Sequence, residues 1–307
     1  MQIVATINTP LLDLMHQMMP DCSMTTLRSW IKQGRVLVSL LICRRAGHLV
    51  QKGDEVKLRP RMKFSESGLK ILYEDSHIVI VEKPMHLLSV ATDAQAEKTV
   101  HSILKRHAKK MVWPVHRLDR DTSGVMVFAY SDKARDKLKA MFEAHDLDRQ
   151  YYALVEGIIK EPKGTWKSFL KEDINYMMKS APEGKWAVTH IEVIKRFEKR
   201  NFTRICCTLE TGRKNQIRVQ SSDALHPIVG DKKYRATTNP FRRLCLHAHL
   251  LRFKHPVTGK EISFTSPVPS FFFTGNSSAR VREKRIEKEK DSKRRAPTYK
   301  RLNAAPR

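Results

Sequence analysis

Long apolar runs are absent from this 307-residue chain, and cysteine is scarce. No run approaches the ~20 residues that a membrane-spanning helix needs, and the first residues lack the basic-then-apolar order of a secretory signal. The five cysteines, at positions 22, 43, 206, 207 and 245, are odd in number and show no Cys-x-x-Cys spacing. This pattern argues against a disulfide framework or a structural zinc site. We therefore expect a cytoplasmic protein with reduced thiols and no membrane association.

Acidic residues are also in short supply. Lys and Arg total 58 against 32 Asp and Glu, which gives a formal net charge of +26. An excess of this size says little about the fold, but it indicates a polyanionic partner. A membrane surface is the rival polyanion, yet the sequence shows neither a basic amphipathic helix nor a lipidation signal. The length suits one substantial domain plus a small one.

The C-terminal segment is rich in charge and poor in apolar residues. Residues 277–307 hold 12 Lys or Arg and four acidic residues, so most of the positive charge lies outside them. A segment with so few aliphatic side chains cannot bury enough surface to fold alone. We expect residues 274–307 to form a basic, disordered tail.

Two short helices are predicted near the N-terminus, with Thr9 before the first and Thr25 opening the second. Two strand-like runs follow, at 35–38 and 53–58, and a basic connection separates them. This order resembles the S-four-like RNA-binding domain, named after a ribosomal protein, over residues 1–60. The alternative is a solvated basic face. By the resemblance, the side chains that contact RNA are those of Arg28, Lys32, Arg35, Arg44 and Arg45.

Residues 61–68 are polar and suit a linker. Apolar runs at 71–73 and 78–83 then predict strands, and the second continues into Lys83-Pro84. Val100, Ile103, Leu104 and Met111 mark one helix by their spacing, and Ser131 caps a further helix with an apolar stripe.

Residues 116–124 read His-Arg-Leu-Asp-Arg-Asp-Thr-Ser-Gly and place Asp119 among basic side chains. The small residues at the end lead into an apolar run at 125–129, which is typical of a loop that enters a strand. A carboxylate on a loop held by a rigid strand is a common way to present a catalytic group. Taken alone, Arg117 and Asp119 would be better explained as a surface ion pair.

These nine residues resemble the signature of the RluA-type pseudouridine synthases, which isomerise uridine in RNA. The resemblance implies an α+β catalytic domain over residues 69–273, with a mixed, largely antiparallel central sheet flanked by helices and loops. It also implies that Asp119 is the essential carboxylate and that no cofactor or metal is needed. Whether Asp119 attacks C1′, attacks the uracil ring or removes a sugar proton stays open. The family segment matching Lys83-Pro84 usually continues to a glycine, so His86 at that position predicts a different turn.

Residues 211–218, Thr-Gly-Arg-Lys-Asn-Gln-Ile-Arg, resemble the family segment Gly-Arg-x-His-Gln-Ile-Arg. By that match Arg218 would pair with Asp119 and keep it ionised, and Ile217 would pack on the uracil. Asn215 replaces the usual histidine, and we expect it to support structure. Without the resemblance, this segment predicts only a basic strand after a Thr-Gly turn. Residues 226–231 also follow the family and are expected to be scaffold after that strand.

Residues 149–157 resemble the family strand that carries the active-site tyrosine, here Tyr151, while Tyr152 on the opposite face is expected to be core. A phenol can stack on the base and exchange a proton. Because chemistry on a stacked base requires extruding it, Arg117 is expected to enter the vacated space, with His116 as a further substrate contact. The alternative is that Arg117 only neutralises a phosphate.

We predict an RNA pseudouridine synthase that acts on a loop or junction uridine of structured RNA. Ribosomal RNA is favoured over transfer RNA because an appended RNA-binding module and a basic arm suit a large folded RNA. One alternative is a non-catalytic RNA-binding or ribosome-assembly protein. A second is a glycosidase-like hydrolase that uses Asp119 with Asp121. We predict no obligate protein partner and expect a monomer. His247 and His249 lack a nearby third ligand and are expected to be ordinary strand residues.

Overall fold

The computed structural model describes residues 1–58, 63–64, 69–91 and 98–274. The expected tail at 274–307 falls outside them apart from Thr274, and so does most of the expected linker at 61–68. Within that linker, Lys63–Phe64 form strand β7, which pairs with β8 (Lys70–Glu74) in the main sheet. The described part of the linker is therefore a strand. Among the described helices, none is long and apolar enough to cross a membrane.

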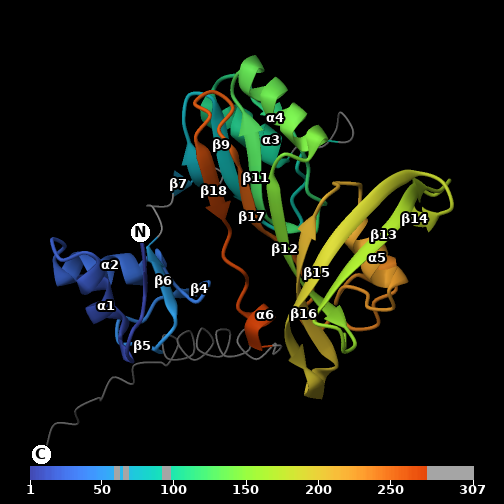
Figure 1. The fold of residues 1–307 in the computed structure, drawn as a ribbon. Coiled ribbons are helices and arrows are strands. Elements are labelled where there is room, and N and C mark those ends of the chain that lie inside the picture. Colours follow the sequence, from blue (N-terminus) through green and yellow to red (C-terminus); the bar gives the residue numbers. More distant parts are fainter. Residues whose placement is uncertain (59–62, 65–68, 92–97, 275–307) are drawn as a thin grey trace, which may run out of the picture.

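The first 58 residues form a small unit of two helices and short strands (Figure 1). Helices α1 (Leu11–Met18) and α2 (Met24–Lys32) bury Met15 and Leu27 in a shared apolar core. We propose, in line with the sequence, that residues 1–60 are a separate domain. The strands of this unit are β1 (Gln2–Val4), β2 (Thr9–Pro10), β3 (Val36–Val38), β4 (Leu41–Cys43), β5 (Leu49–Val50) and β6 (Glu55–Leu58).

These strands make an antiparallel sheet in the order β1-β6-β3-β4, and β2 pairs with β5. The second helix begins earlier than predicted. Ser23, rather than Thr25, caps α2, because its hydroxyl accepts a hydrogen bond from the Thr26 N–H at 3.2 Å.

A twelve-stranded sheet forms the main body, with ten strands in the order β14-β13-β15-β16-β12-β17-β11-β9-β8-β7. Strands β10 and β18 extend it by pairing with β11 and β17. Among these described strands only β11 and β17 run parallel, so the predicted mixed, largely antiparallel α+β fold is confirmed. The strands are β9 (Ile78–Lys83), β10 (Trp113–Pro114), β11 (Ser123–Ala129), β12 (Asp148–Glu156), β13 (Lys163–Glu172), β14 (Met178–Ala181), β15 (Lys185–Phe197), β16 (Phe202–Leu209), β17 (Leu246–Lys254) and β18 (Glu261–Thr265).

Helices α3 (Val100–Ala108) and α4 (Asp132–Ala144) cover opposite faces of one half of this sheet. Successive side chains of a strand point to opposite faces. In β9, Val79 and Val81 therefore join the core under α3, whereas Ile78 and Ile80 join the core under α4. This double burial explains why the first four residues of β9, Ile78 to Val81, are all apolar.

The predicted positions of these two helices are largely confirmed. The hydroxyl of Ser131 caps α4 as expected, accepting from the Ala134 N–H at 3.3 Å. Met111 is a correction, because it lies beyond the end of α3 and is 54% exposed. Lys109 ends that helix by adopting a left-handed conformation, with φ 51°.

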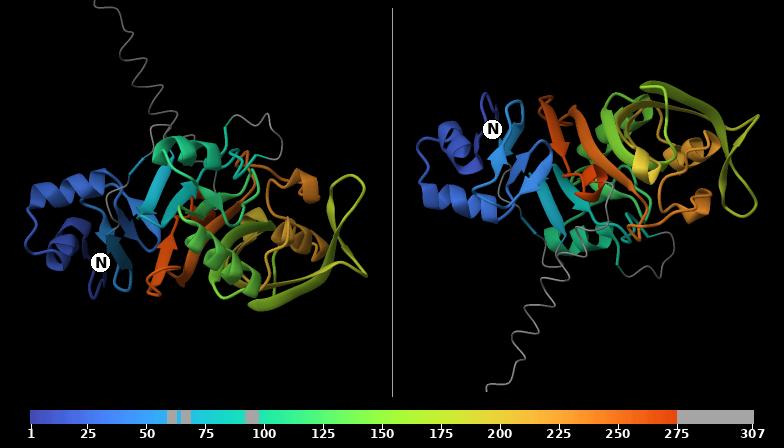
Figure 2. Two further views of the ribbon diagram at one scale, coloured as in Figure 1. Left: turned by 90° about the horizontal axis from the view of Figure 1, so that it is seen from above. Right: turned by 90° about the horizontal axis from the view of Figure 1, so that it is seen from below.

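Helix α5 (Gln216–Asp223) stands where a basic strand was expected, so that prediction is wrong. It packs against the other half of the sheet, beside β13, β14 and β15 (Figure 1). The remaining helical elements are short: η1 (Glu198–Arg200), η2 (Lys232–Tyr234) and α6 (Phe271–Thr274). Viewed from above and below, the N-terminal unit and the β13–β14 hairpin lie at opposite ends of an elongated molecule (Figure 2).

Candidate active site

Asp119 lies on the loop between β10 and β11. The residue before it is anchored in the core, since the Leu118 N–H donates to the Ser89 hydroxyl at 3.0 Å and its carbonyl accepts from that hydroxyl at 2.7 Å. The Thr122 N–H donates to the Asp119 carbonyl at 3.2 Å and closes the turn. The backbone of Asp119 is therefore fixed, while its side chain remains 25% exposed.

Strand β11 approaches β17 closely where this loop ends. Gly124 has φ 129°, and a Cβ atom there would lie 2.1 Å from the Ala248 carbonyl oxygen, so only glycine fits. Next to it, the Ser123 hydroxyl lies 2.9 Å from His247 Nδ1 and accepts a hydrogen bond from Arg243 at 2.7 Å. The loop that carries Asp119 is thus linked at its end to strand β17, which lies more than 100 residues further along the chain.

Arg218 stands on the first turn of α5 and meets two carboxylates. Its Nε and Nη2 atoms donate to both oxygens of Asp231 at 2.7 and 2.8 Å, and its Nη1 atom reaches Asp119 at 3.4 Å. Burial alone would lower the pKa of this guanidinium, but the hydrogen bonds and charge of Asp231, with Asp119 adding, raise it. The predicted pair of Arg218 with Asp119 is present, as the weaker of the two contacts.

Asp231 is a residue that sequence reasoning missed, because residues 226–231 were treated as scaffold. Its side chain is 1% exposed, and both of its carboxylate oxygens accept hydrogen bonds from Arg218. The available signal was the acidic residue that ends the run His-Pro-Ile-Val-Gly-Asp. Its burial, which the structure shows, calls for a paired cation, because Asp is almost never fully buried unless paired.

Asn215 holds the other side of Arg218. Its side-chain amide donates to the Tyr234 hydroxyl at 2.9 Å, and its oxygen accepts from Arg218 Nη1 at 3.1 Å. The residue has φ 54° and immediately precedes α5. Asparagine tolerates this left-handed conformation better than most residues. Neither contact needs a titratable group, which fits the supporting role expected of Asn215.

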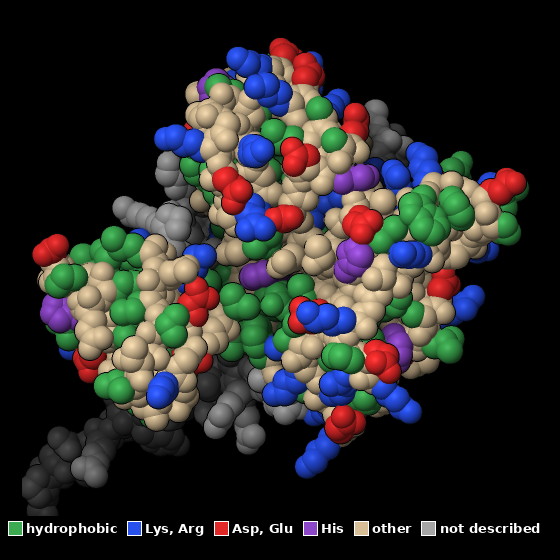
Figure 3. Space-filling model, viewed as in Figure 1, with side chains coloured by type: hydrophobic (Ala, Val, Ile, Leu, Met, Phe, Trp, Pro, Cys, Tyr) green, Lys and Arg blue, Asp and Glu red, His purple; other side chains and the backbone are tan. Residues whose placement is uncertain are grey.

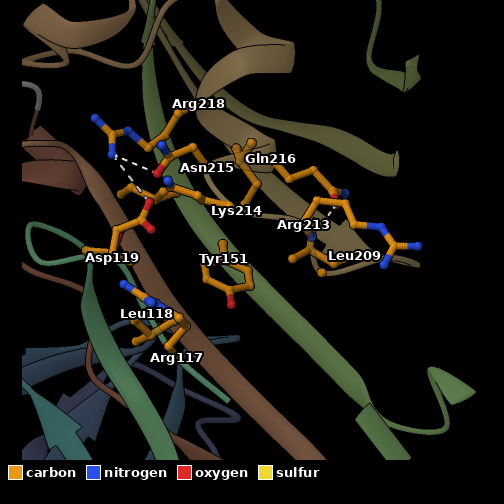
Figure 4. A pocket seen from close by; sticks show the side chains of 14 residues that line it. Arg117, Leu118, Asp119, Tyr151, Leu209, Arg213, Lys214, Asn215, Gln216 and Arg218 are labelled. Atoms are coloured by element: carbon orange, nitrogen blue, oxygen red, sulfur yellow. Dashed lines mark hydrogen bonds and ion pairs between the residues drawn. The ribbon is translucent and has the colours of Figure 1, made fainter. Parts of the chain in front are cut away.

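A cavity of about 240 Å³ opens beside Asp119 and Arg218 (Figure 4). Tyr151 on β12 faces it, and Ile217 on α5 lines it with 5% of its surface exposed. Burial raises the pKa of the Tyr151 phenol, with Arg149 opposing and Asp119 adding to the shift. Within the described residues the Tyr151 hydroxyl has no hydrogen-bond partner. The cavity thus joins a carboxylate, a cation, a phenol and an apolar side chain.

Arg117 and His116 differ in their surroundings. Arg117 is exposed, lines the cavity and makes no hydrogen bond or ion pair to the described part of the chain. His116 is engaged by the protein, because its Nε2 atom accepts from the Val127 N–H at 3.1 Å and its ring stacks on Phe142. Burial, followed by the charge of Arg149, lowers the pKa of His116 to about 3. Its contacts fit an anchor for the loop, and its substrate role stays a prediction.

Lys83 is a second residue that sequence reasoning missed. It is fully buried at the end of β9, and its ammonium donates to the carbonyl oxygens of Pro84, Leu87 and Arg120 at 2.8–3.0 Å. The contact to Arg120 ties β9 to the residue directly after Asp119. Burial lowers the pKa of Lys83 to about 7, although the charges of Asp121 and Asp119 oppose the shift. A lysine two residues after the apolar run Ile78 to Val81, at the end of the same strand, was the available signal.

The turn after Lys83 corrects one expectation. His86 stands where glycine was expected, yet it takes the positive φ of 65° that glycine would supply. Its Nδ1 atom lies 2.8 Å from a carboxylate oxygen of Asp121, which supports this strained conformation. Asp121 is therefore engaged with His86 and is not among the residues that line the cavity.

The basic side chains proposed to contact RNA lie in the N-terminal unit. Arg28, Lys32, Arg44 and Arg45 are exposed. Arg35 is half-buried and lies over the ring of Trp30, 4.4 Å from its centre.

No metal site emerges in the part of the chain that the structure describes, where no group of three His, Cys, Asp or Glu residues could hold an ion. His247 and His249 both lie within hydrogen-bond distance of the Ser266 carbonyl, as strand residues with structural contacts. The five cysteines are free thiols.

Residues 77–223 match the sequence profile of the RNA pseudouridylate synthase family. The chain is 32% identical to ribosomal large subunit pseudouridine synthase D of Vibrio cholerae, over 82% of this chain and 86% of that protein. It is 33% identical to the protein of the same name from Pseudomonas aeruginosa, over 83% and 87%. A solved structure, human RNA pseudouridylate synthase domain containing 1, superposes with a TM-score of 0.56 at 24% identity, covering 66% of this chain and 84% of that one. At that identity the structural likeness supports the fold alone.

Proposed function

Because the chain belongs to the RluA-type family of RNA pseudouridylate synthases and is an RNA pseudouridine synthase, we propose that Asp119 is its catalytic carboxylate and ribosomal RNA its substrate. The single observation that carries this proposal is the position of Asp119. It lies 3.4 Å from Arg218, beside a cavity that Tyr151 also faces.

The isomerisation breaks the bond from N1 of uracil to C1′ of ribose and forms a new bond from C5 to C1′. The proton on C5 is lost and N1 gains one, so the reaction needs no redox change. Each of the possible routes through C1′, the ring or a sugar proton begins with an ionised carboxylate. Arg218 places its positive charge 3.4 Å from the Asp119 carboxylate, and Asp231 fixes the guanidinium in place.

Tyr151 is proposed to hold the freed base and to assist removal of the C5 proton. Its pKa is raised by burial, so the phenol stays protonated near neutrality and can both donate and accept a hydrogen bond. Ile217 offers an apolar surface on the same cavity. This combination of one polar ring and one apolar wall suits a planar base that must rotate within the site.

Arg117 is proposed to fill the space that the extruded uridine leaves. Flipping a base out of a stack costs a few kcal/mol, and a flat guanidinium can replace some of the lost stacking. Its exposure and its lack of a partner among the described residues leave it available for that contact. The N-terminal unit, with Arg28, Lys32, Arg35, Arg44 and Arg45, is proposed to bind folded RNA away from this cavity.

Two features support ribosomal RNA. Relatives that share 32–33% identity over more than four-fifths of this chain carry the name ribosomal large subunit pseudouridine synthase D. The charge of +26 suits a large polyanion. Basic side chains are spread among acidic ones over the face seen in Figure 3, which fits contacts distributed over a wide surface.

The test is to map pseudouridine in ribosomal and transfer RNA from cells that lack the protein, with and without restoration of the wild-type gene. We expect one or more positions in ribosomal RNA to lose pseudouridine and to regain it on restoration. Loss confined to transfer RNA would overturn the assignment of the substrate and leave the activity standing. An in vitro reaction with purified protein and the mapped RNA segment would show that the effect is direct.

A further inference from the structure

A second cavity, of about 510 Å³, adjoins the one that Asp119 lines. The two cavities share five lining residues: Arg117, Tyr151, Leu209, Gly212 and Arg213. Lys139, His145 and Arg149 add further basic side chains to the second cavity, against a single carboxylate from Glu143. A molecule whose base contacts Tyr151 therefore has a strongly cationic space directly beside it.

Arg149 is the unusual member of this set. It lies on β12 two residues before Tyr151 and is 8% exposed. Its Nε and Nη2 atoms are buried without a hydrogen-bond partner, and no carboxylate among the described residues pairs with it. The guanidinium lies over the ring of Phe142, 5.7 Å from its centre, a contact that leaves the N–H donors without an acceptor.

An unpaired buried charge is expensive, because the protein interior replaces little of the hydration that the ion loses. The fold nevertheless makes room for this one. A Cβ atom on Gly212 would lie 2.4 Å from Arg149 Nη1, so the absence of a side chain at Gly212 is what allows the guanidinium to lie there. His145, which also lines this cavity, has a second unsatisfied polar atom: its Nδ1 is buried without a hydrogen-bond partner.

A cation that the protein does not neutralise is suited to an anion that arrives with the ligand. Planar guanidinium groups match phosphate oxygens with two parallel hydrogen bonds, and the unused donors Nε and Nη2 lie on one edge of the fork. The neighbouring Arg117 and Lys139 are exposed and add positive charge at the same cavity.

We propose that Arg149 binds a backbone phosphate of the RNA next to the uridine that occupies the catalytic cavity. This inference rests on the proposed site, because it requires the uridine to lie between Asp119 and Tyr151. The phosphate completes the hydrogen bonds of the buried guanidinium and fixes the ribose near Asp119. Arg149 is thus a substrate-binding residue, and the absence of a side chain at Gly212 leaves room for its guanidinium.

The test measures RNA binding by Arg149→Met in an Asp119→Asn background, so that no turnover occurs. We expect the dissociation constant to rise about tenfold or more and the dependence of binding on salt to weaken by about one phosphate contact. The control is Lys139→Met, an exposed cation on the same cavity, for which we expect a change of about twofold or less.

A neutral methylphosphonate placed at each position around the target uridine identifies the phosphate. At one position it should weaken binding to the protein that retains Arg149 and leave binding to Arg149→Met unchanged. Additive losses at every position would overturn the inference. So would a variant that binds RNA normally but has a reduced kcat when Asp119 is present, because Arg149 would then act through Tyr151.

Stability gives an independent check on the RNA-free protein. Since Arg149→Met removes an unpaired buried charge, its melting temperature should equal or exceed that of the parent protein. A clear fall would mean that Arg149 is structural and would overturn the inference. Failure of the proposed catalytic site shows differently, as wild-type pseudouridine formation by Asp119→Asn alone.

Discussion

At the level of single residues, Arg218 is held by two carboxylates of different character. Asp231 is buried and binds with both oxygens, whereas Asp119 is a quarter exposed and makes one longer contact. Asp231 therefore serves as the permanent counter-ion. Asp119 lies beside the same positive charge and remains accessible to a ligand in the cavity.

Replacing Asp231 by Asn should damage both stability and activity. Breaking one partner of a buried ion pair costs about 3–5 kcal/mol, and Asn retains part of the hydrogen bonding, so we expect the free energy of unfolding to fall by about 2–3 kcal/mol. The rate of pseudouridine formation should fall at least tenfold, because Arg218 is no longer fixed. Denaturant unfolding and a single-turnover assay measure these effects.

Asp223→Asn is the matched control for this change, at the exposed end of the same helix. Its effect on stability should stay within about 0.5 kcal/mol. An Asp231→Asn protein as stable and active as the wild type would contradict the role given to Asp231.

The site residues show what sequence could and could not supply at this scale. Asp119, Tyr151, Ile217 and Arg218 were selected by resemblance, and the structure brings all four to one cavity. Asp231 and Lys83 were not selected, because the sequence does not show that these two side chains are buried or which groups they contact in the folded protein.

At the level of elements, regular apolar spacing made some helices predictable. Helices α3 and α4 show apolar stripes and capping residues, and both lie where they were expected. Helix α5 shows no stripe, because buried residues surround its axis and several are polar. Gln216 and Gln220 are satisfied by hydrogen bonds to β15, including the Ala187 and Val188 carbonyls. Only the tertiary structure supplies those partners, so a local pattern could not indicate this helix.

Strand β17 carries a buried histidine that makes stability depend on pH. Burial lowers the pKa of His247 to about 3, whereas an unfolded histidine titrates near ~6.5. Between these values the unfolded chain binds a proton that the folded chain does not, so stability falls as the pH falls below ~6.5. The slope contributed by this residue is about 1.4 kcal/mol per pH unit.

His247→Gln should therefore flatten the acid limb of the stability curve by about this slope, measured by denaturant unfolding from pH 7 to pH 4. Its own stability at pH 7 should fall slightly, since the contact with Ser123 is altered. His48→Gln, at an exposed position, should leave the slope unchanged. If the stability of His247→Gln changed with pH as steeply as that of the wild type, His247 would be protonated in the folded protein as it is in the unfolded chain, which would contradict the prediction.

At the level of the whole molecule, composition and motif gave different kinds of information. The charge indicated a polyanion, and the sequence motifs indicated the fold and the reaction, both of which are confirmed. The N-terminal unit and the main sheet form distinct apolar cores, and their separation as domains stays our proposal. Composition could not reveal which uridine enters the cavity, because that choice depends on the shape of the RNA as well as on the protein.

The central claim is that the carboxylate of Asp119 carries out the isomerisation. The most direct measurement compares pseudouridine formation by Asp119→Asn, Asp121→Asn and wild-type protein on the mapped RNA, with folding checked by circular dichroism and RNA binding. We predict that Asp119→Asn binds RNA and forms no measurable pseudouridine. Asp121→Asn, whose side chain contacts His86 outside the cavity, should retain most of the activity. Wild-type rates from folded Asp119→Asn protein would contradict the account.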